Sequence, residues 1–93
     1  MIVGLLTLDL HLLEADSLKA KRFVIKGLKD RIRSRFNVSI SEVDGHDLWQ
    51  RSILGIAYIT NEKRMIDKTF EEIRRIVINT PSVEIIDSSI NIL

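Results

Sequence analysis

The sequence predicts an α+β protein in which two helices cover one face of a four-stranded antiparallel sheet. Three observations support this prediction. Four segments have the alternation or the dense apolar character of β-strands, and two segments carry apolar residues at helical spacing. These segments follow one another in the order β-α-β-β-α-β. The 93 residues also have the length and composition of one globular domain, which we place at residues 1–93.

The first strand is predicted at Leu6–Leu12, where apolar residues alternate with Thr7, Asp9 and His11. The apolar run that opens the chain is too short to cross a bilayer and has no basic leader, so we do not expect a targeting segment. A helix is predicted next. It begins at an N-cap, Asp16 or Ser17, and its core-facing residues at helical spacing are Leu18, Ile25, Leu28, Ile32 and Phe36.

The rest of the chain is predicted to form a β-hairpin, a second helix and a last strand. A short strand at Val38–Val43 leads into an Asp44-Gly45 turn and a loop, and a strongly apolar strand follows at Arg51–Thr60. Asn61 is the expected N-cap of the second helix, which ends before Pro81 because the residue preceding a proline avoids the helical region. The apolar face of this helix comprises Met65, Ile66, Thr69, Phe70, Ile73, Ile76 and Val77, and the last strand is predicted at Val83–Leu93.

Right-handed crossovers turn this order of elements into the ferredoxin-like fold, with the first and third strands in the middle of the sheet. The residues expected in the core between sheet and helices are Leu6, Leu8, Leu28, Ile32, Phe70 and Ile73.

The third strand is apolar on both faces, although helices can cover only one of them. We therefore predict a homo-oligomer, most simply a dimer, that packs through the open face of the sheet at Ile53, Ala57 and Ile59. The alternative is ordinary surface hydrophobicity, since isolated exposed apolar residues are common.

Positive charge is concentrated on the first helix. Eight of the fourteen Lys and Arg residues lie between Lys19 and Arg35 with one acid, Asp30, which gives this segment +7 and leaves −6 on the rest. Five of these bases recur at steps of three and four on one side of the predicted helix, over about 20 Å. We call them the basic stripe; they are Lys19, Arg22, Lys26, Lys29 and Arg33.

Such a ladder of cations can follow a nucleic-acid backbone, gaining free energy as counterions are released. On the helical wheel we expect no acid within the stripe, with Asp30 on the other side of the helix. The alternative interpretation is a solvated face whose bases pair with Asp67, Glu71 or Glu72 of the second helix. The strands carry one aromatic residue, Tyr58, so the sheet itself is a poor platform for stacking RNA bases.

No catalytic constellation is evident. The chain has no cysteine, no glycine-rich phosphate loop and no nucleophile elbow. The candidate metal ligands are few, namely Asp9 with His11, and His46 between Asp44 and Asp47. We expect a protein that is not an enzyme and that uses no cofactor and no metal. The absence of cysteine suits a reducing cytoplasm. Trp49 is interpreted as a plug at the edge of the core, the alternative being an anchor for a base or a partner.

The segments SLKAKR, FNVSISEVD and DLWQR, in this order and spacing, resemble the YlxP family of small bacterial proteins, and the likeness runs nearly end to end. The resemblance implies a ferredoxin-like fold and a cytoplasmic role near RNA or the ribosome, and it supplies no catalytic residues. Among the matching residues, we expect Asn37 to be a left-handed helix C-cap and Glu42 to pair with Arg51 across the hairpin.

Two functions remain open. The first is a non-enzymatic accessory factor of RNA or the ribosome that contacts phosphate through the basic stripe. The alternative is a protein-interaction or small-ligand-binding module that uses the open sheet face.

Overall fold

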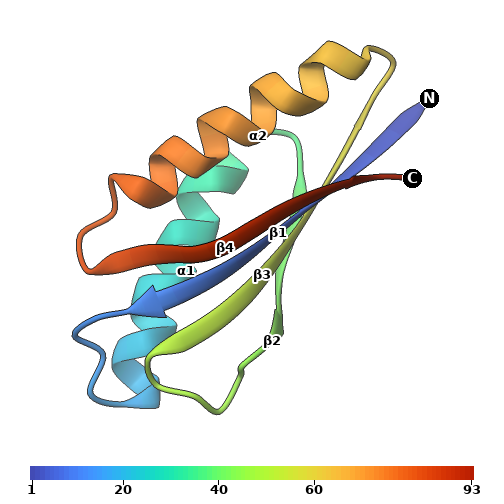
Figure 1. Cartoon of the computed structure of the whole chain (residues 1–93). Coiled ribbons are helices and arrows are strands. Elements are labelled where there is room, and N and C mark those ends of the chain that lie inside the picture. Colours follow the sequence, from blue (N-terminus) through green and yellow to red (C-terminus); the bar gives the residue numbers. More distant parts are fainter.

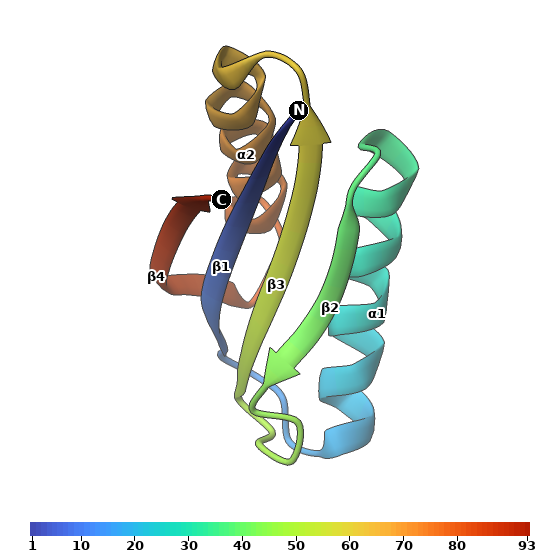
Figure 2. The same cartoon turned by 90° about the vertical axis from the view of Figure 1, so that its right-hand side faces the viewer.

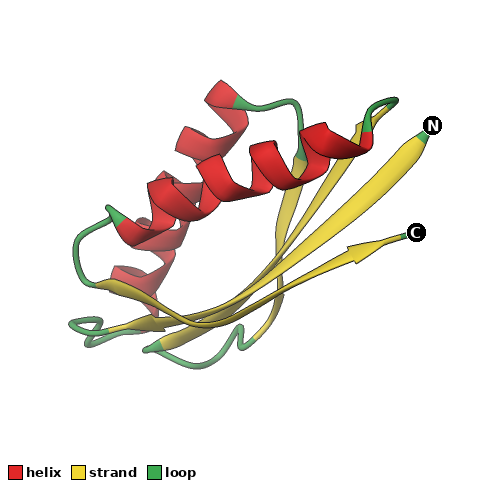
Figure 3. Cartoon of the chain, turned by 45° about the horizontal axis from the view of Figure 1, so that its top comes forward, coloured by secondary structure: helices red, strands yellow, loops and turns green.

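The computed structural model describes residues 1–93 and contains four strands and two helices (Figure 1). The sheet order is β2-β3-β1-β4 with antiparallel neighbours throughout, and both helices lie on one side of it (Figure 3). The predicted ferredoxin-like fold is therefore confirmed. The elements are β1 (Ile2–Leu12), α1 (Leu18–Arg35), β2 (Ser39–Asp44), β3 (Arg51–Thr60), α2 (Lys63–Ile78) and β4 (Val83–Ile92).

The core lies between the central strands and the helices. β1 and β3 pair along their whole lengths, which sets Leu6 opposite Ile56 and Leu8 opposite Leu54 on the face that the helices cover. Burial of these side chains supplies most of the driving force for folding. All six residues predicted for the core are fully buried, namely Leu6, Leu8, Leu28, Ile32, Phe70 and Ile73.

The helix ends follow the sequence only in part. Ser17 caps α1, with its Oγ accepting a hydrogen bond from the amide of Ala20 at 3.0 Å. The expected caps at Asn37 and Asn61 are wrong. Phe36 ends α1 in an extended conformation that packs its ring against the core, and Glu62 occupies the start of α2 without a capping side-chain bond.

The open face of the sheet carries apolar residues along β3, as the alternation predicted. Ile53, Gly55 and Ala57 are half-buried there, whereas Ile59 is 53% exposed. Val43 projects beside Gly55 so closely that a Cβ at residue 55 would lie 3.0 Å from it, which explains why glycine stands at this position. No helix of the chain is long and apolar enough to span a membrane.

Candidate nucleic-acid interface

The basic stripe lies on the side of α1 that faces the edge strand β2, where the two elements run side by side (Figure 2). Four of its members line a groove of about 370 Å³ at this margin, and the remaining one, Lys19, lies one turn before Arg22 and Phe23 in the exposed first part of the helix. The stripe residues that line the groove are Arg22, Lys26, Lys29 and Arg33.

The expectation that no acid neighbours the stripe was wrong. Asp30 lies 2.8 Å from the Nζ of Lys26 and 3.8 Å from a guanidinium nitrogen of Arg33. The reason is helical geometry, since residues three and four apart are neighbours on a helix. The hydrogen bond from Lys26 holds the pKa of Asp30 below its ordinary value. Both pairs are exposed, so they lower the charge of the stripe by one without fixing the side chains strongly.

The alternative of neutralisation by the second helix finds no support in the ion pairs. None of the six salt bridges joins α1 to α2, and Glu71 pairs with Arg74 within α2. Lys19, Arg22 and Lys29 take part in none of them. The side of α1 toward β2 therefore keeps a strong excess of positive charge.

Arg33 also has a structural contact. Its guanidinium donates a 3.0 Å hydrogen bond to the carbonyl oxygen of Ile40 in β2, so it ties the helix to the edge strand. This contact fixes the end of the groove nearest the C-terminus of α1 and leaves about half of the Arg33 side chain exposed.

A buried polar cluster underlies the end of the groove nearest the N-terminus of α1. Lys21 is only 1% exposed, and its ammonium lies 3.0 Å from a carboxylate oxygen of Glu42, which also accepts a 2.6 Å hydrogen bond from Ser52. The same ammonium donates to the carbonyl oxygens of Gly45 and His46. The cluster therefore fastens α1 to the β2–β3 hairpin, which turns at Gly45 with a φ of 77° that favours glycine.

The charge state of Glu42 follows from these contacts. Its partial burial alone would raise the pKa of the carboxyl group, but hydrogen bonds from Ser52 and Lys21 and the positive charge of Lys21 outweigh that effect. The pKa of Glu42 is therefore lowered, which keeps this carboxylate ionised at neutral pH. Lys21 thus serves the fold, and it is the one base of the SLKAKR segment that is withdrawn from the surface.

The predicted pair between Glu42 and Arg51 was wrong. Glu42 lies on the helix side of the sheet, whereas Arg51 lies on the open side and binds both carboxylate oxygens of Asp9, at 3.0 and 2.5 Å. These hydrogen bonds lower the pKa of Asp9. The Asp9–Arg51 ion pair therefore lies at one end of the apolar open face.

Two aromatic side chains are more exposed than the sequence suggested. Trp49 is 54% exposed in the loop between β2 and β3, so its interpretation as a core plug was wrong. Phe23, which the sequence analysis did not single out, is 81% exposed on the outer side of α1. Its position on the helical wheel, opposite the core stripe and beside Lys19 and Lys26, was the signal that could have identified it.

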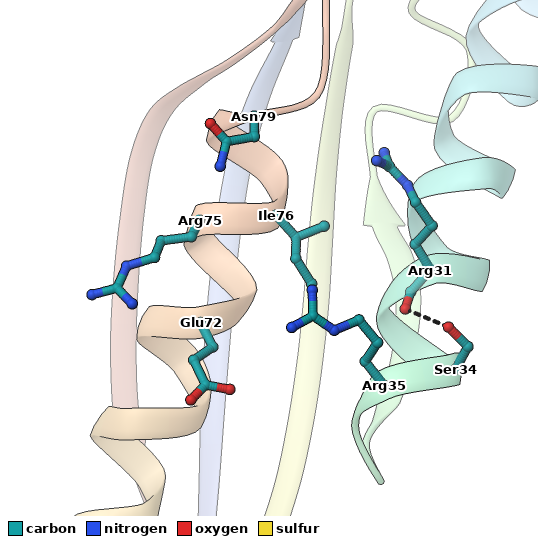
Figure 4. A pocket seen from close by; sticks show the side chains of 7 residues that line it. All are labelled: Arg31, Ser34, Arg35, Glu72, Arg75, Ile76 and Asn79. Atoms are coloured by element: carbon teal, nitrogen blue, oxygen red, sulfur yellow. Dashed lines mark hydrogen bonds between the residues drawn. The ribbon is translucent and has the colours of Figure 1, made fainter.

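A second hollow, of about 570 Å³, lies between α1 and α2 and is lined by three arginines, Arg31, Arg35 and Arg75, with Glu72 as the acid (Figure 4). Their guanidinium groups do not meet at one point. Arg31 donates a 2.8 Å hydrogen bond to Thr80, Arg35 extends toward α2, and Arg75 points away from α1. The hollow is cationic, but its guanidinium groups point in different directions, and Arg31 is held by its hydrogen bond to Thr80.

Acidic and histidine side chains are dispersed. No group of three or more His, Asp or Glu side chains is arranged to hold a metal ion.

Comparisons with known proteins define the family. The chain is 32% identical over 83 residues to "Uncharacterized protein YlxP" of Bacillus subtilis (strain 168), an alignment that covers 89% of this chain and 90% of that protein. Among solved structures, the de novo designed protein Foldit4 has a TM-score of 0.59 at 14% identity, covering 100% of this chain and 97% of its own. The designed protein LFR1 1 with ferredoxin fold has a TM-score of 0.58 at 14% identity, covering 100% and 84%.

Both designed proteins are similar to this chain in fold alone. The profile of the family described as "Protein of unknown function (DUF503)" matches residues 3–90, which is nearly the whole chain. With the resemblance to the YlxP protein over the same region, the chain belongs to the DUF503 family.

Proposed function

We propose that the protein is a non-enzymatic accessory factor that associates with RNA or the ribosome and contacts phosphate through the basic stripe of α1. The single observation that carries the proposal is the groove along β2, where four cations of the stripe line one continuous surface and Asp30 is the one acid paired with them. Contacts of this kind supply affinity for phosphate with little sequence preference. A cytoplasmic location belongs to the same proposal.

The test is a titration of labelled ribosomal RNA fragments at several salt concentrations. Four cations that each meet one phosphate of a single strand give a slope of log affinity against log salt of about −3. The variant Lys26→Glu/Lys29→Glu should abolish binding. It should change the melting temperature by only a few degrees, because exposed ion pairs such as Lys26–Asp30 contribute at most about 1 kcal/mol.

A matched control separates a local effect from a change in total charge. Lys63→Glu/Lys68→Glu makes the same charge change on exposed residues of α2 that take part in no ion pair. This control should bind RNA nearly as well as the native protein. Equal affinities of the native protein and the Lys26/Lys29 variant would remove the stripe from the proposal.

We further propose that two copies associate through the open sheet face, with Ile53, Ala57 and Ile59 in the contact. Three strands of ten or eleven residues and the six-residue β2, spaced about 4.8 Å apart, present roughly 600 Å². This is close to the roughly 800 Å² that each partner contributes to a standard interface. Continuity supports the proposal as well, since exposed Val43 extends the apolar surface of β3 toward the edge of the sheet.

Sedimentation equilibrium tests this second proposal. Ile59→Glu should convert a dimer into a monomer without loss of fold, because Ile59 is 53% exposed in the single chain. Ile78→Glu is the control, since Ile78 is 63% exposed on α2, away from the sheet face. A native protein that sediments as a monomer at high concentration would contradict the proposal.

A further inference from the structure

We infer that the nucleic acid bound along α1 is single-stranded and that Phe23 stacks on one of its bases. The inference rests on the proposed function, and it adds the strand class and the residue that selects it. Phe23 is 81% exposed, which makes it the most exposed aromatic residue in the chain, and no contact within the fold accounts for its position.

The neighbours of Phe23 on the helix are those that a stacked base requires. Lys19 precedes it by one turn and Lys26 follows it by three residues, so both cations border the ring on the surface of α1. Lys26 is 76% exposed at its side chain and can contact a phosphate next to the stacked base. An aromatic ring among cations that track a backbone is the common arrangement of proteins that bind single strands.

The surface on the far side of the ring is open. Gly27 lies one turn after Phe23, and no atom lies within 4 Å of the position that a Cβ at residue 27 would occupy. The backbone there does not need glycine, because Gly27 has no positive φ and sits within a regular helix. A bare helix surface next to an exposed ring leaves room for a planar base to lie against it.

Charge alone does not distinguish strand classes, since the stripe can contact phosphates of a duplex as well as those of a single strand. Bases in a duplex are already stacked on each other and are not free to stack on a protein ring. The preference for single strands therefore depends on Phe23, and the affinity common to both classes depends on the stripe. This separation makes the inference testable apart from the proposed function.

The experiment compares a 12-nucleotide RNA and the duplex of the same sequence by fluorescence anisotropy. Phe23→Ala should weaken binding of the single strand roughly 5- to 150-fold, the range for loss of one base–aromatic stack, and change duplex binding less than about twofold. Phe23→Leu keeps an apolar side chain but lacks the ring, and it should behave like the alanine variant. Phe23→Trp should retain or strengthen single-strand binding.

A second variant tests the same surface by covering the ring of Phe23 without changing Phe23 itself. Gly27→Leu places an aliphatic side chain four residues after Phe23, where such pairs contact each other and the ring becomes covered. It should weaken single-strand binding while raising the melting temperature, because leucine has a much higher helix propensity than glycine. A role of Phe23 in stability alone predicts no such opposite change.

The outcomes separate the two proposals. If Lys26→Glu/Lys29→Glu loses both RNAs and Phe23→Ala loses only the single strand, both proposals stand. If Phe23→Ala binds both RNAs like the native protein, or loses both equally, the stacking inference is overturned and the stripe remains. If the native protein binds neither RNA, the proposed function fails and the inference fails with it.

Discussion

Replacing Glu42 by leucine removes the one carboxylate that contacts the buried ammonium of Lys21. At 3.0 Å and an effective dielectric constant of about 20, the two charges attract each other by roughly 5 kcal/mol. The net cost of removing one member of a buried pair is roughly 3–5 kcal/mol. We expect about 3 kcal/mol, at the lower end, because the carbonyl oxygens of Gly45 and His46 still accept from Lys21.

The double variant Lys21→Met/Glu42→Leu tests the physical reason for this cost. It removes both charges together and keeps apolar volume in the cluster, so its stability should return to within about 1 kcal/mol of the native value. Urea unfolding followed by circular dichroism measures all variants. The loss in Glu42→Leu corresponds to a fall in melting temperature of about 12 to 24 °C for a chain of this length.

The same pair predicts a dependence on pH. The pKa of Glu42 is lower in the folded chain than its ordinary value of 4.5, so the stability that it contributes is fully present above about pH 4.5. That contribution is lost as the pH falls through the lowered pKa. The difference in stability between the native protein and the double variant should therefore shift against the native protein in acid. The reasoning is refuted if Glu42→Leu loses less than 1 kcal/mol at pH 7, or if the double variant loses as much stability as the single variants Glu42→Leu and Lys21→Met lose together.

Three further predictions concern single positions. Gly4→Ala should lower the free energy of unfolding by about 1–3 kcal/mol, because the new Cβ would lie 2.9 Å from Ile66. Gly27→Ala places its Cβ in open space and should raise the free energy of unfolding by about 1 kcal/mol. Calorimetry that finds the same sign for both variants would contradict the packing. Asp9→Asn should cost about 0.5–1 kcal/mol in thermal unfolding at low salt and less at high salt, since the side chain of its partner Arg51 is about half exposed although that of Asp9 is only 18% exposed. Trp49, the single tryptophan, should be quenched readily by iodide at low protein concentration, and a protected indole would show that the loop is covered.

Periodicity was sufficient to predict the fold, because each strand has to present one face to the helices and each helix one stripe to the sheet. The burial of Lys21 was also predictable in principle. Residues 21, 25, 28 and 32 share the spacing of the core stripe, so the lysine stands in a core position. The sequence analysis did not include Lys21 among the core-facing residues of the helix, although a carboxylate on the neighbouring strand was available to pair with it.

Other features depend on geometry that local patterns do not contain. Glu42 lies two residues after buried Ile40 and opposite buried Leu54, so the register between β2 and β3 sets it on the helix face, whereas Arg51 shares the open face with Ile53. The end of α1 is set by the packing of Phe36, which outweighs the preference of Asn37 for a left-handed cap. The pairing of Asp30, in contrast, could have been predicted from spacing, because Asp30 lies four residues after Lys26 and three before Arg33.

The separation of charge between α1 and the rest of the chain has a kinetic consequence. With +7 between residues 19 and 35 and −6 elsewhere, the molecule has a large electric dipole although its net charge is only +1. In the field of a polyanion such a molecule rotates before it makes contact, so that α1 leads and the acidic strands trail. The first collisions are then already oriented, and added salt should slow association more than it speeds dissociation.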